Sequence, residues 1–541
     1  MSSDFNLIDH PWLAVQRSDG TADEVSLRDV FRESASLRTL GGEVSTQAFA
    51  NLRLCIALLY CSVGVPDRDA WTRLWRDGPP LGAVEEYLDA CRDRFGLFDP
   101  VTPFYQVADL RTASGKVDGL EKLIADVPNG APYQTTRAGA GLARISPAEA
   151  ARWLVHVHAF DPSGIRSAAV GDPLQKAGKG YPIGPGWAGR LGGVVLLGDN
   201  LWQTLLLNTV PIDQYEARPD DDLAPWERDP DTALRTDFSD TGPRGPIHLL
   251  TLQSRRVRLI GDDGGVTGVI LAQGDRLLPQ NQFRFEPMTA WRYSKPQSQK
   301  LKTLVYMPRA HSPERALWRN TAALLPTIPG GDPPPTMPPR TMEWIGEVAD
   351  VVGTRSRLGL QAIGMAYGSN ESTVAEIIND TVDLSITLIG QESERVAGII
   401  DDAVVAAETA VKLAGHLAAN LARASGERGE DAGGAAYAKA VEDGFARVDQ
   451  PCRRWLSELT GASERDAVLG AWHTSVCDIA RDLARELLEQ TGPAAVAGRM
   501  VDGTYISAAL AEIWFAAGLA KALLRAAQYL EHRSKEGSDC S

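Results

Sequence analysis

Two histidines, His156 and His158, with Asp161 close behind them, are the closest grouping of candidate catalytic side chains in the chain. Ser146 begins a predicted helix that runs to Phe160, because Ser-Pro-Ala-Glu matches a capping box with proline at the first helical position. On a helix, positions i and i+2 point to different faces, so the two histidines cannot share a metal ion as an i, i+4 pair would. We interpret them as ordinary helix or pocket histidines. A hydrolase that uses His156, His158 and Asp161 stays as an alternative function.

Motifs for other catalytic chemistry are absent from the sequence. It contains no G-x-x-x-x-G-K-[ST] phosphate loop, no G-x-S-x-G nucleophile elbow and no H-E-x-x-H metal motif. The six cysteines form no C-x-x-C pair with metal-ligand spacing, and they indicate a reduced, cytoplasmic protein. We therefore expect no metal centre and no cofactor, and the sequence shows no catalytic centre.

A glycine-rich, basic stretch from Asp161 to Gly193 is the most unusual segment. It contains nine glycines and four basic residues, Arg166, Lys176, Lys179 and Arg190, against two acids. Glycine lets a backbone approach a ligand closely, and scattered arginine and lysine suit a phosphate partner. By composition alone, a plain connecting loop is the simpler interpretation.

The charge distribution limits the kind of partner. The formal net charge is −15, which argues against a free-standing protein coated in basic residues for nucleic-acid binding. Residues 130–190 nevertheless hold seven basic and three acidic side chains, a local charge of +4. This local excess is compatible with a DNA contact made inside a larger assembly.

The elements that must position these residues suggest a mixed α+β fold. With 541 residues, the chain is expected to form at least two domains. We predict a large mixed α/β domain over residues 1–370, with a proline-rich linker at about 326–340, and a four-helix bundle over 371–541. No uninterrupted apolar stretch of about 18 residues occurs, so no membrane span is expected. In the first domain, the predicted elements are helices at 46–64, 80–94 and 146–160, a strand and helix from Val194, and strand-like sequence over 247–305 with a hairpin at Asp262-Asp263-Gly264-Gly265. Beyond 371 the sequence is predicted to be continuously helical, with its last helices at 435–459, 464–490 and 494–533.

Several ordered motifs resemble the CasA family, the large subunit of the type I-E CRISPR surveillance complex, Cascade. They are FNLIDHPWLAV, LRLCIALLY, TPFYQV, LEKLIADV, LWQTLLLNTVP and YGSNESTVAEIINDTVDL, and their order spans essentially the whole chain. The resemblance implies a non-enzymatic subunit that recognises the protospacer-adjacent motif in double-stranded target DNA. It also implies help in strand opening, a landing surface for the helicase-nuclease effector, and assembly with guide RNA and the other Cascade subunits. The protein would read the short motif, and base pairing would read the sequence.

The resemblance also suggests site residues. The family's glycine loop falls on Asp161–Arg166, which places Ser163 and Gly164 nearest the minor groove, with Ile165 and Arg166 beside them. The family's glutamine wedge aligns with Glu371, and Asn370 is the alternative wedge, because a carboxylate near phosphates is electrostatically unfavourable. No lysine stands at the family's lysine finger, where Arg276 is the substitute. The loop that contacts the guide-RNA end falls on about 129–140, with Tyr133 and Arg137.

Simpler interpretations remain open at this stage for these residues. Arg166 and Arg276 could be ordinary surface arginines, and Asn370 could cap a helix. The strand arginines Arg255, Arg256 and Arg258 could form a solvated face or a DNA-facing one. A purely structural scaffold is a further alternative function.

Overall fold

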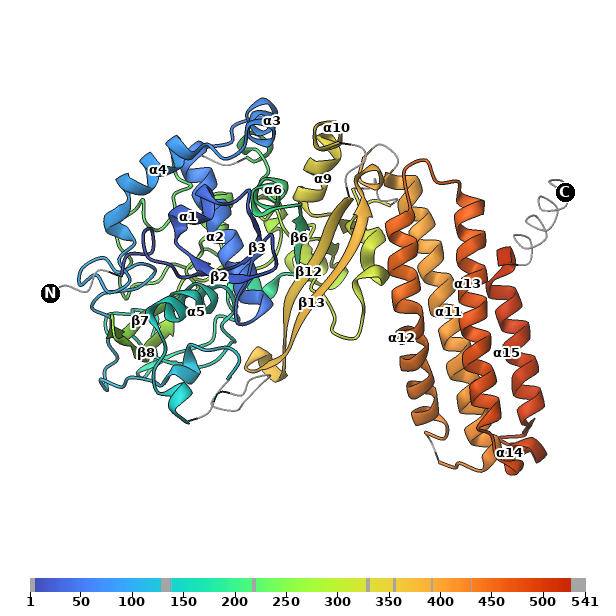
Figure 1. The fold of residues 1–541 in the computed structure, drawn as a ribbon. Coiled ribbons are helices and arrows are strands. Elements are labelled where there is room, and N and C mark those ends of the chain that lie inside the picture. The colour runs from blue at the N-terminus through green and yellow to red at the C-terminus, as the bar shows by residue number, and fades with distance from the viewer. Residues whose placement is uncertain are drawn as a thin grey trace. The chain divides into compact units, whose positions relative to one another are not determined.

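The computed structural model describes residues 5–127, 137, 139–216, 220–326, 331–353, 357–390, 393–429 and 431–526. The chain divides into two compact units. The first unit comprises Met1–Arg315, Ile328–Val352 and Leu358–Thr381, and the second comprises Ala316–Thr327, Gly353–Arg357 and Val382–Ser541. Helices and several small sheets build the first unit, and long helices build the second, so the expected α+β fold class is confirmed (Figure 1).

The first unit surrounds its sheets with short helices. Its helices are α1 (Leu27–Arg32), α2 (Ser45–Val63), α3 (Arg68–Asp77), α4 (Leu81–Ala90), α5 (Pro147–Phe160), α6 (Leu201–Leu207), α7 (Pro246–Leu250), α8 (Lys295–Leu301), α9 (Arg340–Glu347) and α10 (Ala349–Val352). Its strands are β1 (Leu13–Arg17), β2 (Ala22–Val25), β3 (Leu37–Leu40), β4 (Arg166–Ser167), β5 (Lys179–Gly180), β6 (Gly193–Leu197), β7 (Arg255–Asp262), β8 (Gly265–Gln273), β9 (Trp291–Tyr293), β10 (Tyr306–Pro308), β11 (Thr336–Met337), β12 (Arg357–Tyr367) and β13 (Val374–Ser385). They form sheets in the orders β2-β1-β3, β10-β9-β11 and β13-β12-β6, with the pairs β4-β5 and β7-β8.

Helix α2 is the central core element of the first unit. From Thr46 to Tyr60 every residue except Ala48 is buried, polar side chains such as Asn51 and Arg53 included, and the helix packs against α4, α5 and α7. By length and composition it could cross a membrane, but 78% of its most apolar window is buried inside the protein, as in a core helix. The chain leaves α2 at Gly64, whose left-handed φ of 78° ends the helix.

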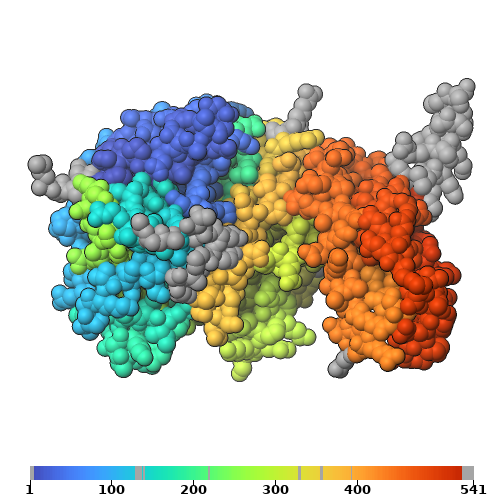
Figure 2. Space-filling model, turned by 60° about the horizontal axis from the view of Figure 1, so that its bottom comes forward, coloured from blue at the N-terminus to red at the C-terminus, as the bar shows by residue number. Residues whose placement is uncertain are grey.

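The hairpin of β12 and β13 corrects one prediction. Residues beyond 371 were expected to be helical, but Val374–Ser385 is a strand paired with β12. Its β-branched residues, including Ile377, Ile378 and Thr381, favour an extended chain. The two strands run side by side as a long hairpin (Figure 1). The yellow segment that contains this hairpin lies on the face of the molecule shown in Figure 2. Asn370 therefore caps no helix, because it lies in the turn of this hairpin.

Segment 247–305 also departs from the prediction, because it contains two helices, α7 and α8, besides its strands. Each begins with a proline in its first turn, at Pro246 and Pro296, where the missing N–H costs nothing. The predicted hairpin is present as β7 and β8, which pair in an antiparallel register from Arg255 opposite Gln273 to Asp262 opposite Gly265.

Four long helices pack together in the second unit: α11 (Ser393–Ser425), α12 (Gly434–Glu458), α13 (Arg465–Glu489) and α15 (Ala508–Ala522). The fourth was expected to run unbroken from about residue 494. Instead, a short helix α14 (Pro493–Ala497) and a hairpin of β14 (Arg499–Val501) and β15 (Thr504–Ile506) precede α15. Asp502 and Gly503 both have positive φ, 47° and 80°, as a tight Asp-Gly hairpin turn requires. The boundary proposed near residue 370 between separate domains stays a prediction.

A buried ion pair ties α2 to the segment before β9. Arg53 on α2 donates to both carboxylate oxygens of Glu286, at 2.7 and 2.9 Å, and the two side chains are 3% and 0% exposed. Trp187 donates its indole N–H to the same carboxylate at 2.9 Å. Removing one charge of such a pair leaves the other buried and uncompensated.

We expect Glu286→Gln to lower the free energy of unfolding by about 3–5 kcal/mol, because the Arg53 guanidinium loses its counter-charge without solvent access. The matched control is Glu216→Gln, whose carboxylate pairs with Arg284 at 3.4 Å with both side chains largely exposed. This change should leave stability almost unaltered. Urea unfolding followed by tryptophan fluorescence tests this. Equal midpoints for the two variants would contradict the prediction.

Candidate nucleic-acid interface

Asp161 lies at the end of α5 and anchors the loop that follows. Its carboxylate accepts from the Nε of Arg255 on β7 at 2.5 Å and from the Nη2 of Arg166 at 2.5 Å. Arg255 is 1% exposed, and its Nη2 also donates to the backbone oxygens of Asp161, Pro162 and Gly184 at 3.0–3.1 Å. Burial lowers the pKa of Arg255, and the Asp161 charge opposes that shift. The Arg255 guanidinium thus holds the backbone before the loop, at Asp161 and Pro162, and after it, at Gly184.

The loop from Ser163 to Arg166 is held on its inner side and open on its outer side. Gly164 accepts from the side-chain amide of Gln273 on β8 at 2.8 Å, and Ile165 is 58% exposed. A Cβ on Gly164 would meet no atom within 4 Å, so packing within the chain does not require glycine there. The loop borders a cavity of about 290 Å³, together with Lys122 and Thr373. The bare backbone of Gly164 therefore offers an external partner a close approach.

Arg166 is neither an exposed arginine nor a free one. Its side chain is 13% exposed and is bonded to Asp161 and to the Pro162 carbonyl at 3.0 Å. The interpretation of Arg166 as an ordinary surface arginine is therefore wrong. Its two bonds, to the Asp161 carboxylate and to the Pro162 carbonyl, hold the start of the loop.

The tip of the β12–β13 hairpin meets this loop. The backbone N–H of Ser163 donates to the Glu371 carbonyl at 2.8 Å. Asn370 and Glu371 both have a left-handed φ of 56°, and both are exposed. At the base of the turn, the Tyr367 hydroxyl donates to the Phe160 carbonyl at 2.7 Å, at the end of α5. The structure thus brings together two predicted segments that are about 200 residues apart.

Arg190 supplies a further positive charge behind the hairpin tip. Its Nη2 donates to the Ile183 carbonyl at 2.5 Å. Burial lowers the pKa of Arg190, and the strongest opposing influence is the negative charge of Glu371. Glu371 therefore lies in the field of an arginine, which partly offsets its charge.

The remaining predicted residues lie in other surroundings. Arg276 follows Gln273 by three residues and forms an exposed ion pair with Asp237 at 3.0 Å. Arg137 pairs with Asp126 at 3.2 Å and with Glu149 on α5 at 2.6 Å. Tyr133 lies outside the described residues.

Two of the three strand arginines correct another prediction. Arg255 and Arg256 are 1% and 3% exposed, so their side chains form neither a solvated face nor a DNA-facing one. Arg256 pairs with Asp275 at 2.8 Å, and that carboxylate side chain is 3% exposed. The two arginines are buried because acids from other segments neutralise them, and Arg255 anchors the loop instead of binding a partner.

The histidines are held as packing residues. His156 is hydrogen-bonded through Nε2 to the Thr46 hydroxyl at 3.0 Å, and His158 through Nε2 to the Tyr105 carbonyl at 2.9 Å. Burial lowers their pKa values to about 3 and about 4, which leaves two weak bases bonded to different elements. Within the described residues, no group of three or more His, Cys, Asp or Glu side chains could hold a metal ion. His156 is paired with a hydroxyl, but Thr46 and His156 are 0% and 1% exposed, and an imidazole of such low pKa is a poor general base, so the pair does not support the hydrolase alternative.

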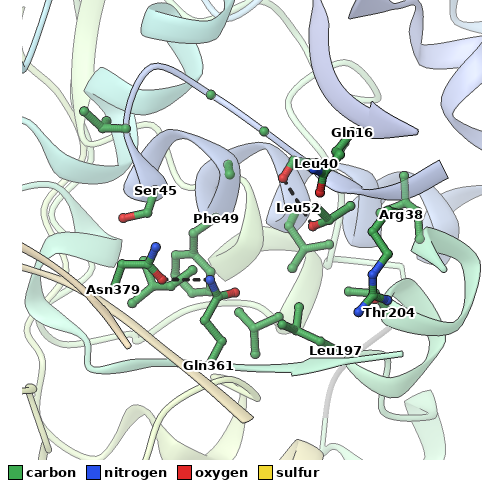
Figure 3. Close-up of a pocket in the computed structure, with 18 of the residues that line it drawn as sticks. Gln16, Arg38, Leu40, Ser45, Phe49, Leu52, Leu197, Thr204, Gln361 and Asn379 are labelled. Carbon is green, nitrogen blue, oxygen red and sulfur yellow. Dashed lines mark hydrogen bonds between the residues drawn. The ribbon is translucent and has the colours of Figure 1, made fainter. Parts of the chain in front are cut away.

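A larger cavity of about 460 Å³ lies elsewhere in the first unit (Figure 3). Residues of β3, α2, β6, β12 and β13 line it, and Gln361 donates to Asn379 at 2.8 Å across two of these strands. None of the residues predicted to contact DNA lines this cavity. The candidate interface is therefore the smaller cavity with its loop and hairpin tip.

We expect Asp161→Asn to lower the free energy of unfolding by about 3 kcal/mol or more, because two guanidiniums, one fully buried, lose their shared counter-charge. Asp237→Asn is the control, since it removes the carboxylate of the exposed pair with Arg276. Hydrogen exchange should show faster exchange of the Ser163 amide in the first variant only. Unchanged exchange and stability in Asp161→Asn would contradict the role of this carboxylate.

Comparisons with known proteins identify the family of the chain. A family model described as CRISPR-associated protein Cse1 matches residues 6–483. The CRISPR-associated protein CasA/Cse1 of Thermus thermophilus is 29% identical over 449 residues, covering 80% of this chain and 81% of that protein. The crystal structure of Thermobifida fusca Cse1 is 40% identical, with a TM-score of 0.88 and coverage of 97% of this chain and 99% of that one.

A chain of a CRISPR RNA-guided surveillance complex shares the fold, with a TM-score of 0.65 at 19% identity, covering 90% of this chain and 100% of that chain. The family model covers most of the sequence, and the Thermobifida fusca protein is similar over nearly all of it. On these grounds the chain belongs to the CRISPR-associated Cse1 family, also called CasA.

Proposed function

We propose that this chain is the non-catalytic large subunit of a type I-E CRISPR ribonucleoprotein, where it recognises the protospacer-adjacent motif in duplex DNA. It promotes strand opening for guide pairing and recruits the helicase-nuclease. Its partners are the target duplex, the guide RNA with the other Cascade subunits, and that effector, in the cytoplasm. Membership of the Cse1 family supports this proposal, as does the fold shared with a chain of an RNA-guided surveillance complex.

The observation that carries the proposal is the bond between the Ser163 N–H and the Glu371 carbonyl. It joins an open glycine loop to the tip of the β12–β13 hairpin through two backbone groups. Gly164 presents backbone to the minor groove, whose few donors and acceptors suit tolerant motif reading, and Ser163, which is 8% exposed, lies directly behind it and positions it. The hairpin tip then lies beside the first base step to be opened.

Of the two wedge candidates, the geometry favours Asn370. Glu371 uses its carbonyl to hold Ser163, and its carboxylate lies in the field of Arg190. Asn370 is exposed at the tip, and its neutral amide avoids repulsion from phosphates. In the place of the family's lysine finger, Arg276 can exchange its exposed partner Asp237 for a phosphate at little cost.

Gly164→Val tests the reading loop, because the new side chain meets open space within the protein and blocks only an external partner. In the assembled complex with guide RNA, we expect affinity for motif-bearing duplex to fall about tenfold or more, since lost base contacts cost about 1–3 kcal/mol each. Affinity for a scrambled-motif duplex should change little. Gel-shift titration of both duplexes gives the ratio.

Gly82→Val is the matched control, because a Cβ there also meets no atom within 4 Å, on α4. It should leave both affinities unchanged. If Gly164→Val binds both duplexes as the control does, the loop does not read the motif. If the unaltered complex binds the two duplexes equally, the subunit is no motif reader, and the scaffold alternative gains.

A further inference from the structure

A short β-ribbon leaves the reading loop and returns to it. Strand β4 pairs with β5 in an antiparallel register, Arg166 opposite Gly180 and Ser167 opposite Lys179. The side-chain amide of Gln273, which holds the Gly164 carbonyl at 2.8 Å, also reaches the Gly180 carbonyl at 3.4 Å. One buried glutamine therefore fixes the ribbon to the loop. Any partner seated on Gly164 also lies next to β5.

A two-residue turn next to β5 joins Lys176 to Lys179, the first residue of that strand, so Lys179 pairs with Lys176 on one side and with Ser167 of β4 on the other. Each lysine N–H donates to the other lysine's carbonyl, at 3.0 and 3.1 Å. Between them, Ala177 and Gly178 have φ values of 50° and 71°, as a tight hairpin turn requires. Such a reciprocal pair places two side chains directly opposite each other on one face, with Cα atoms about 5.5 Å apart.

This turn carries two local costs. Like charges directly opposite on a strand pair repel each other. Ala177 has a Cβ and yet adopts the left-handed region, which is sterically unfavourable for a residue other than glycine. Asparagine or glycine would relieve the backbone, and an acid in place of either lysine would relieve the repulsion. Local strain of this kind is typical of functional positions.

No acid on the ribbon compensates for the lysines. Lys176 and Lys179 are exposed, and no carboxylate of the described residues forms an ion pair with either one. The one acid between Arg166 and Tyr181, Asp172, is 4% exposed at its side chain and pairs with Arg235 at 3.2 Å. The exposed charges of this segment are therefore all positive.

We propose that Lys176 and Lys179 form a phosphate clamp that grips the backbone of the same duplex whose motif lies against Ser163 and Gly164. The proposal rests on the proposed function, and it assigns affinity to the ribbon and motif discrimination to the loop. A phosphate between the two ammonium groups removes their repulsion and releases counterions. Because Gln273 ties the ribbon to the loop, the clamp sets the orientation and register in which the duplex meets Gly164.

The double variant Lys176→Gln with Lys179→Gln tests the clamp in the assembled complex with guide RNA. Affinities for motif-bearing and scrambled duplex are measured over about 50–200 mM salt. We expect both affinities to fall by a similar factor and the ratio between them to stay constant. The slope of log K against log salt should shrink by about 1, since the one phosphate held between the lysines contributes about 0.9. Lys439→Gln with Lys521→Gln, two exposed lysines of the helical unit, is the control of equal charge.

The possible results separate the clamp from the motif reader. A double variant with unaltered affinity and salt slope, in a complex that still discriminates the motif, overturns the clamp alone. An equal loss in the control pair also overturns it, because net charge then suffices. A lost ratio with an unchanged salt slope overturns it too, since the lysines would then act on the reading geometry. A complex that never discriminates the motif overturns the proposed function instead.

Discussion

The arrangement of the candidate interface depends on one buried ion pair, between Asp161 and Arg255. Such a pair brings little net stability, since desolvation offsets most of the attraction. Its effect is on geometry. Besides the carboxylate, the Arg255 guanidinium reaches the backbone carbonyls of Asp161, Pro162 and Gly184, so the chain on both sides of the loop is held to strand β7. Arg166 closes the loop by sharing the same carboxylate.

Rigidity on one side and openness on the other is what a backbone reader of DNA needs. Ser163 is held by the hairpin tip and Gly164 by Gln273, and the outer face of Gly164 stays bare. Minor-groove contacts made by backbone groups lose their selectivity if the loop moves. In this account the ion pair, the glutamine and the hairpin tip together keep the loop fixed before any partner arrives.

Local signals in the sequence predicted a large part of the fold. The Ser146 capping box begins α5, the Asp-Asp-Gly-Gly turn joins β7 to β8, and the apolar run of α2 is buried. The errors arose next to long helical sequences. Strand β13 directly precedes the helical sequence that begins near residue 390, and it was predicted to be helical as well. The Asp502-Gly503 turn was likewise predicted to be part of the last helix. The family resemblance suggested Ser163, Gly164 and Asn370, but no pattern in the sequence indicated that Arg255 anchors the loop. Its partner Asp161 lies 94 residues away, and no periodicity records a contact over that separation.

A structure of the assembled complex on motif-bearing duplex tests the central claim most directly. The account predicts the motif's minor groove against Ser163 and Gly164, with Asn370 beside the first opened base step. It also predicts that the Asp161–Arg255 pair is retained. A complex in which the motif contacts another surface, while this loop and the hairpin tip face solvent, would contradict it.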